Sequence, residues 1–110
     1  MDWKELNSSA QLAEIHKKSF ERPLVIFKHS TRCSISSMAK SRLERSNPPE
    51  GIDFYYLDLI RYRPLSDQIA KDFDVWHESP QILIIENGAC IYDESHTGIN
   101  MAEILTSISR

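Results

Sequence analysis

Hydrophobic residues recur along the chain with two different spacings, and these separate predicted strands from predicted helices. Short apolar runs that contain β-branched residues are typical of buried strands. Three such runs are Leu24–Phe27, Ile52–Leu59 and Gln81–Glu86. A fourth strand, Ala89–Tyr92, follows the turn sequence Asn87-Gly88, which favours a two-residue hairpin and therefore antiparallel pairing. Asp2–Leu6 is predicted as a short edge strand.

Apolar residues spaced three and four positions apart predict four helices between and after these strands. Their expected starts are Ser8 or Ser9, the region just after Cys33, Pro64 in a first turn, and Asn100 as a cap with Glu103 as its capping-box partner. The residues assigned to their buried faces are, helix by helix, Leu12, Ile15 and Phe20; Ile35, Met38, Ala39 and Leu43; Leu65, Ile69 and Phe73; and Met101, Ile104, Leu105 and Ile108.

The resulting order is β-α-β-α-β-α-β-β-α. The sequence has no repeat or linker, so residues 1–110 are predicted to form one domain. The proline- and glycine-containing segment Asn47–Gly51 is predicted to interrupt regular secondary structure. Short βαβ crossovers require parallel strands, and the last hairpin adds an antiparallel edge. We therefore expect a three-layer α/β/α domain with a mixed central sheet.

Composition narrows the class of protein. Hydrophobic residues make up 41% and charged residues 26%, with a net charge of −3, so neither nucleic acid nor a membrane is an expected partner. The start of the chain lacks the pattern of a signal peptide. Cys33 and Cys90 are too far apart for zinc-ligand spacing and are too few for a disulfide framework. We expect a reduced, cytoplasmic protein without a metal.

Cys33 is the main candidate for chemistry, because it lies at the predicted opening of the second helix. Unpaired N–H groups and the helix dipole at such a position stabilise a thiolate. Lys28, His29 and Arg32 are close in sequence and could add positive charge. The alternative is an inert buried cysteine. Cys90, just after the hairpin turn, is predicted to have that core role.

Ser36 stands where a dithiol protein would carry its second cysteine, so Cys33 has no internal resolving thiol. The Ser36 hydroxyl could hydrogen-bond the thiolate, or the residue could simply suit a first helical turn.

The element order, with a cysteine opening the second helix and Pro80 just before the hairpin, resembles the thioredoxin fold. In that fold this proline is cis and lies opposite the active cysteine. The turn leaves the backbone N–H and C=O of Ser79 able to pair with an extended substrate chain.

Two motifs carry a closer resemblance: F-K-H-S-T-R-C-S-I-S at 27–36 and H-E-S-P-Q at 77–81. They resemble the YtxJ-like monothiol bacilliredoxins (bacilliredoxin C) over nearly the whole chain. The resemblance implies a bacterial thiol-disulfide oxidoreductase that removes bacillithiol from proteins, with a role in thiol redox homeostasis and oxidative stress. Its partners would be S-bacillithiolated client proteins and a low-molecular-weight thiol. Bacillithiol would be a co-substrate, and no cofactor is implied.

The resemblance assigns Cys33 as nucleophile, Pro80 as cis-proline and Ser79 to substrate pairing. A further set of residues matches the family pattern: His29, Thr31, Ser36, His77 and Glu78. The predicted thiolate-stabilising group around Cys33 consists of His29, Thr31, Arg32 and Ser36. Ser34 departs from the pattern, because the family usually has proline there. Serine restores an N–H and adds a hydroxyl, which puts the redox poise of the site in question.

Thr97-Gly98-Ile99-Asn100, at the start of the last helix, is a candidate site for the carboxylates of bacillithiol, because free N–H groups there favour anions. Gly98 would allow close approach of a ligand. The same residues could equally be a turn and a cap. Two other functions stay open at this stage: an iron–sulfur carrier of monothiol-glutaredoxin type, and a non-catalytic thioredoxin-fold adaptor.

Overall fold

The structure is a computed structural model that describes residues 2–46, 48 and 50–108. The predicted order of strands and helices is confirmed, with a short 3₁₀ helix added before the last helix. In chain order the elements are β1 (Trp3–Glu5), α1 (Ser9–Lys18), β2 (Leu24–His29), α2 (Ser34–Glu44), β3 (Asp53–Asp58), α3 (Arg63–Asp72), β4 (Gln81–Glu86), β5 (Ala89–Ser95), η1 (His96–Gly98) and α4 (Met101–Ser107). The predicted break at Asn47–Gly51 lies partly outside the described residues.

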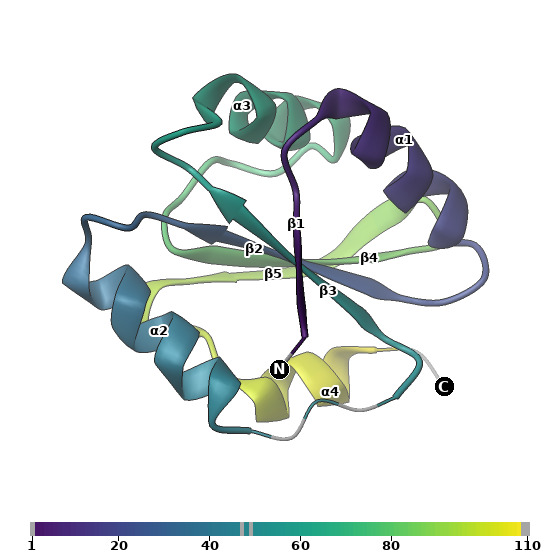
Figure 1. Ribbon diagram of the computed structural model, residues 1–110. Coiled ribbons are helices and arrows are strands. Elements are labelled where there is room, and N and C mark those ends of the chain that lie inside the picture. The colour runs from purple at the N-terminus through teal and green to yellow at the C-terminus, as the bar shows by residue number, and fades with distance from the viewer. Residues whose placement is uncertain (1, 47, 49, 109–110) are drawn as a thin grey trace.

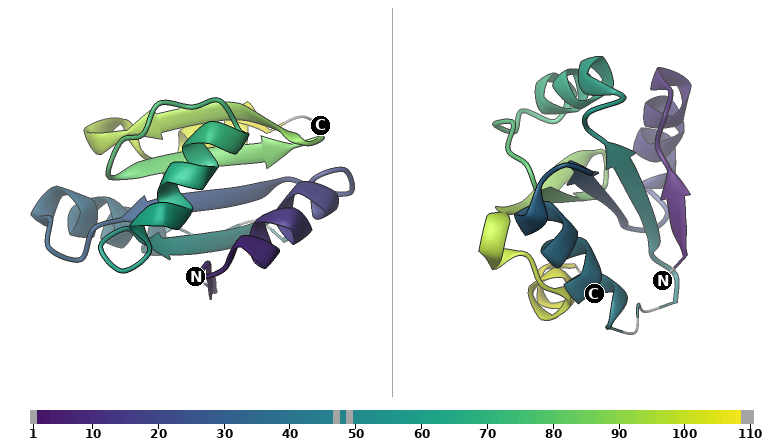
Figure 2. Two further views of the ribbon diagram at one scale, coloured as in Figure 1. Left: turned by 90° about the horizontal axis from the view of Figure 1, so that it is seen from above. Right: turned by 60° about the vertical axis from the view of Figure 1, so that its left-hand side comes forward.

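The five strands form one mixed sheet in the order β1-β3-β2-β4-β5. β1 and β2 both pair in parallel with β3, whereas β4 runs antiparallel to β2 and to β5. Helices α1 and α3 cover one face of the sheet, and α2 and α4 cover the other (Figures 1 and 2). The predicted three-layer α/β/α fold is therefore confirmed.

Side chains along β2 alternate between two hydrophobic cores, as they must in a strand that is covered on both faces. Leu24 and Ile26 belong to the core beneath α1 and α3. Val25 and Phe27 belong to the core beneath α2 and α4. The last two residues of the strand, Lys28 and His29, continue this alternation and are buried as well.

The hairpin between β4 and β5 has the predicted turn, with φ of 54° at Asn87 and 81° at Gly88. Such positive values suit asparagine and glycine, because neither pays the full steric cost of this conformation. A Cβ at position 88 would lie 2.6 Å from the ring of Phe20. Phe20 thus lies outside α1 against this turn and is 58% exposed, so its assignment to the buried face of the first helix was wrong.

A second correction concerns α2, which turns a different face to the sheet than its hydrophobic pattern predicts. Ser36, Ala39 and Leu43 are its buried residues. Ile35 and Met38 are instead 47% and 63% exposed. The helix thus buries a serine and leaves two large apolar side chains near its start in contact with solvent.

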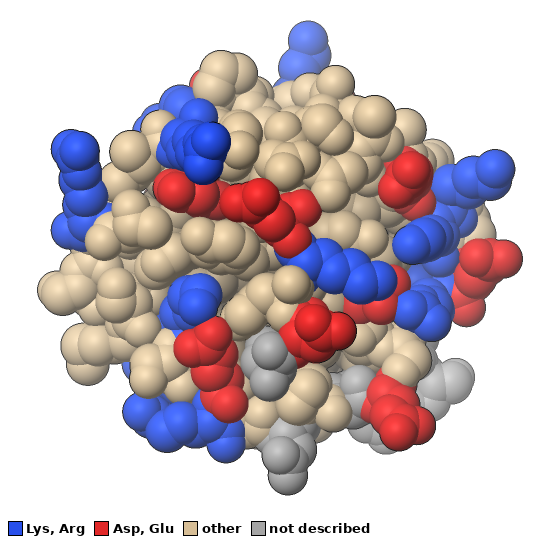
Figure 3. Space-filling model, viewed as in Figure 1, with Lys and Arg blue, Asp and Glu red and all other residues tan. Residues whose placement is uncertain are grey.

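Basic and acidic side chains are interspersed over the face of the molecule drawn in Figure 3. Because the two kinds of charge are interspersed, their electric fields largely offset each other, in keeping with the small net charge of −3. Within the described ranges, none of the helices has the length and apolar character needed to cross a membrane.

Candidate functional site

Cys33 is the N-cap residue of α2, in an extended conformation with φ of −108° and ψ of 121°. Its thiol is free and half-buried. The turn before the helix is closed by the Cys33 N–H, which donates to the Ser30 carbonyl at 3.1 Å. The Cys33 carbonyl accepts from the Ser37 N–H at 3.0 Å, which starts the helix. The cysteine therefore lies where the first N–H groups of α2 lack partners within the helix.

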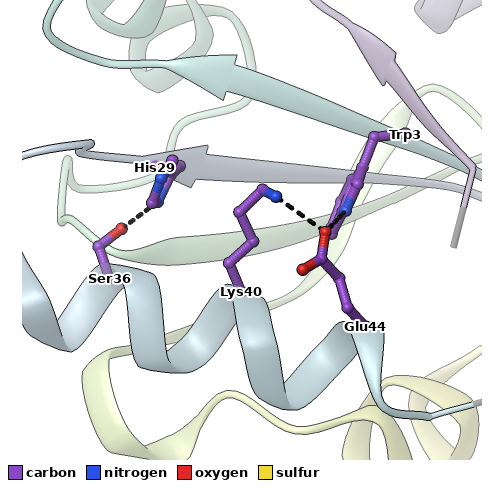
Figure 4. A network of polar contacts seen from close by, with 5 residues as sticks. All are labelled: Trp3, His29, Ser36, Lys40 and Glu44. Atoms are coloured by element: carbon purple, nitrogen blue, oxygen red, sulfur yellow. Dashed lines mark hydrogen bonds and ion pairs between the residues drawn. The ribbon is translucent and has the colours of Figure 1, made fainter.

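Ser36, three residues further, is fully buried beneath the first turn of α2. Its Oγ accepts a hydrogen bond from the Ser30 N–H at 3.0 Å and lies 2.7 Å from Nδ1 of His29 (Figure 4). In the part of the chain that the structure describes, no hydrogen bond joins Ser36 to Cys33. Ser36 thus fastens the start of α2 to the end of β2, and its predicted direct effect on the thiolate stays a prediction.

His29 is buried between aromatic rings, stacked on Phe27 at 5.7 Å and 5.8 Å from the ring of Tyr56. Burial lowers the pKa of His29, and the positive charge of Lys40 lowers it further. The imidazole is therefore neutral at neutral pH. The expectation that His29 adds positive charge beside Cys33 was wrong, because a buried ring without a carboxylate bonded to it favours its uncharged form.

Lys28 was also expected to lie near the Cys33 thiol, but its side chain points to the face of the sheet that α3 covers, away from α2. Its Nζ donates to the Ser66 carbonyl of α3 at 3.2 Å and lies 3.4 Å from Nδ1 of His77. Only Thr31 and Arg32 of the predicted stabilising group remain exposed in the turn next to Cys33. Their effect on the thiol stays a prediction.

The Ser79–Pro80 peptide bond is cis, as the sequence predicts. Pro80 lies directly before β4, and Gln81 pairs with Lys28 near the end of β2, so Pro80 and Cys33 belong to the same end of the sheet. The Pro80 carbonyl accepts from the His96 N–H at 3.0 Å, which ties this turn to η1. Among the described residues, the backbone N–H and C=O of Ser79 make no hydrogen bond. Their pairing with an extended chain stays a prediction.

Large apolar side chains gather in exposed positions at this same end of the sheet. Ile35 and Met38 lie on α2, Ile60 follows the end of β3, and Trp76 precedes the cis-proline turn with 92% of its surface exposed. Exposed apolar groups near one edge are typical of a surface that contacts another protein. The sequence pattern missed Trp76 and Ile60, and it placed Ile35 and Met38 in the core.

The predicted anion site at Thr97 and Gly98 has a different environment from the one expected. These residues form η1, and α4 begins only at Met101. The Glu94 side chain lies against Gly98, where an added Cβ would be 2.6 Å from its carboxyl carbon. A carboxylate beside Gly98 disfavours a second anion there. The Asn100 cap is confirmed, because its Oδ1 accepts from the Glu103 N–H at 2.9 Å.

Cys90 lies on β5 and packs against the core beneath α1 and α3. Burial raises the pKa of its thiol to about 11, so it is protonated at neutral pH. It lies next to the hairpin, at the opposite end of β4 from Pro80, as expected. Within the described residues, no cluster of three or more His, Cys, Asp or Glu side chains is arranged to hold a metal ion.

Comparison with solved structures defines the class. A proposed oxidoreductase with a thioredoxin fold matches with a TM-score of 0.84 and 30% identity, covering 96% of this chain and 92% of the other. The thioredoxin of Malassezia sympodialis matches with a TM-score of 0.74 and 16% identity, covering 96% and 87%. Thioredoxin from Trypanosoma brucei brucei gives 0.76 and 11%, with the same coverage. The protein has a thioredoxin fold.

The particular family follows from a family model. The model described as monothiol bacilliredoxin BrxC matches residues 4–104. The chain belongs to this family, and fold and family together support a role in thiol redox chemistry.

Proposed function

We propose that this protein is a single-thiol oxidoreductase that removes bacillithiol from S-bacillithiolated proteins in a reducing cytosol. One observation carries the proposal. Cys33 is a free, half-buried thiol at the start of α2, while the position three residues on holds a buried serine that is bonded to His29 and Ser30. A site with one thiol and no resolving partner is suited to taking a small thiol from one disulfide and passing it to another.

The exchange has two steps, and each replaces one disulfide by another without an external oxidant or reductant. The Cys33 thiolate attacks the bacillithiol sulfur of the client's mixed disulfide, and the client leaves as a thiolate that takes up a proton from water. Cys33 then carries bacillithiol as a mixed disulfide. A second low-molecular-weight thiol attacks the bacillithiol sulfur, which restores Cys33 and yields a small disulfide. Neither step requires a metal, flavin or nucleotide.

The surroundings of Cys33 support the proposal that the substrate disulfide is carried by a client protein. Ser79 offers an unpaired backbone N–H and C=O at the same end of the sheet, which could align a client segment in extended form. Ile35, Met38 and Trp76 offer apolar contact area on either side. The choice of bacillithiol rests on the family, whose model is described as monothiol bacilliredoxin BrxC.

The test is a competition among three mixed disulfides of one client protein, made with bacillithiol, glutathione and cysteine. We expect fastest release of the client from the bacillithiol adduct, with mass spectrometry detecting bacillithiol on Cys33. Cys33→Ser should abolish release, and Cys90→Ser should leave it unchanged, because the Cys90 thiol is protonated and lies at the opposite end of β4 from Pro80. Equal rates for all three adducts would overturn the assignment of bacillithiol, and full activity of Cys33→Ser would overturn the mechanism.

A further inference from the structure

Lys28 and Gln81 are two buried polar residues that lie opposite each other on neighbouring strands. They pair across β2 and β4, so both side chains leave the sheet on the same face. Lys28 is fully buried and Gln81 is 1% exposed. Burial of polar groups at this level is unfavourable unless they bind something specific, so their partners indicate what the pair is for.

Both side chains bind the segment that leads into the cis-proline turn. Gln81 Nε2 donates to the Trp76 carbonyl at 2.9 Å. Lys28 Nζ lies 3.4 Å from Nδ1 of His77, and Ser66 Oγ lies 3.2 Å from the same nitrogen. Two adjacent strands thus bind Trp76 and His77, which lie three and two residues before Ser79.

The protonation states agree with this arrangement. An ammonium group has donors only, so Nδ1 of His77 must accept, and the ring must carry its proton on Nε2. Burial lowers the pKa of His77, and the charge of Lys28 lowers it further, so the ring is neutral at neutral pH. Lys28 is faced by Asp67 and Arg63 of α3 and by Cys90 of β5, and none of these forms an ion pair with it among the described residues.

We propose that Lys28 and Gln81 are positioning residues that hold the Trp76 backbone and the His77 ring against the sheet and thereby orient the Ser79 backbone to receive an extended client chain. The proposal deepens the function proposed above and rests on the same site. It also explains why F-K-H-S-T and H-E-S-P-Q occur together in this chain: each motif supplies one member of a buried contact between residues 49 positions apart.

The consequence is a separation between two kinds of disulfide. A peptide disulfide needs both the Cys33 thiol and the Ser79 backbone, whereas a small disulfide without a peptide chain needs only the thiol. Disturbing the Lys28–His77 contact should therefore slow the reaction with the peptide and leave the reaction with the small disulfide unchanged.

The experiment uses a cysteine peptide activated with 2-thiopyridine, and dithiodipyridine as the small disulfide. In both reactions Cys33 forms a mixed disulfide and releases thiopyridone, whose absorbance gives the rate. For Lys28→Met we expect the ratio of peptide rate to small-disulfide rate to fall about fivefold, the effect of losing one positioned hydrogen bond. Exposed Lys71 provides the matched control, and Lys71→Met should keep the wild-type ratio.

His77→Phe tests the same contact from the other side and should lower the ratio similarly. Nitrogen NMR of His77 should reveal the Nε2–H tautomer in the wild type and a mixture in Lys28→Met. An unchanged ratio in both variants, or an equal fall of both rates, would overturn the proposal. Because neither probe contains bacillithiol, a failure of the bacillithiol assignment would leave this result unaffected.

Discussion

Lys28 and His29 are neighbours in sequence, both are buried, and they face opposite layers of the molecule. His29 lies under α2, bonded to Ser36 at the helix that begins after Cys33. Lys28 lies under α3, against His77 of the segment that leads to Pro80. The end of one strand thus reaches both halves of the site, one on each face of the sheet.

The two residues differ in how they tolerate burial. His29 loses its charge, because its pKa is lowered from an ordinary value that is already near neutral. The pKa of Lys28 is lowered by burial to about 8, so at neutral pH it still carries most of its charge. The His29 contact should therefore stabilise the fold, and Lys28 should cost stability. A buried charge that costs stability is a candidate for a functional role.

Removing the contact between Ser36 and His29 should have the largest effect on stability. Ser36→Ala removes the partner of the Ser30 N–H and of His29 Nδ1, and each unpartnered group costs about 1–3 kcal/mol. We expect the free energy of unfolding to fall by about 3 kcal/mol, measured by urea denaturation. Ser37→Ala is the control, because Ser37 is the exposed neighbour on the same helix. Equal stability of the two variants would contradict a fastening role for Ser36.

Replacing Lys28 should have the opposite effect and raise the free energy of unfolding. A pKa of about 8 in place of 10.5 corresponds to a net penalty of ~3 kcal/mol at neutral pH for keeping the ammonium in the folded chain. Lys28→Met removes this penalty but also removes the contacts of Nζ with Ser66 and His77. Lys28→Met should therefore raise the free energy of unfolding by about 1–2 kcal/mol at pH 7. The gain should be lost, and turn into a small deficit, as pH rises from about 8 through 10.5, because folded and unfolded wild type then both hold a neutral amine and only the lost contacts of residue 28 remain.

The same denaturation experiment, repeated from pH 7 to pH 11 with Lys71→Met as control, measures this trend. A Lys28→Met variant that is less stable than wild type at pH 7 would mean that the ammonium contributes net stability. The contrast between the two faces of β2 would then be wrong.

Acidification should produce a smaller effect that acts on both faces. His29 and His77 both have lowered pKa values when folded, so the unfolded chain binds protons that the folded chain refuses. Stability is therefore present above the ordinary histidine pKa of 6.5 and is lost as pH falls from 7 to 5. We expect His29→Gln and His77→Gln each to reduce this slope in urea titrations. A wild type whose stability stayed constant or rose over this range would contradict the burial of the two rings in neutral form.

The sequence predicts the order of elements well, because its signals for them are local. Asn87-Gly88 specifies a turn by backbone conformation alone, and the run before it reads as a buried strand. The end of β2 is different: Lys28 and His29 look like loop residues, and β2 was predicted to end at Phe27. The burial of Lys28 depends on Ser66 and His77, which are 38 and 49 positions away and leave no local pattern.

The face of α2 was mispredicted for a related reason. A hydrophobic pattern ranks Ile35 and Met38 above Ser36, but the side chain that faces β2 there must bond to His29. A serine satisfies that requirement and an isoleucine does not. Polar residues that are buried as a pair are invisible to a scale that ranks residues one at a time, so the sequence located Cys33 and Pro80 but not the surfaces around them.

The smallest expected effect concerns Lys40, which connects His29 to the rest of α2 by charge alone. Lys40 Nζ forms an ion pair with Glu44 at 2.8 Å, and Glu44 also accepts from the indole N–H of Trp3 (Figure 4). The positive charge of Lys40 lowers the pKa of His29, whereas the negative charge of Glu44 raises it. In Lys40→Met the lowering charge is lost and the raising one remains, so the pKa of His29 should rise. NMR titration of the His29 ring measures it, with Lys17→Met on α1 as control. Equal His29 pKa values in both variants would leave burial as the main reason that this ring stays neutral while Lys28 beside it stays charged. A fall in the His29 pKa would contradict the direction of the Lys40 effect.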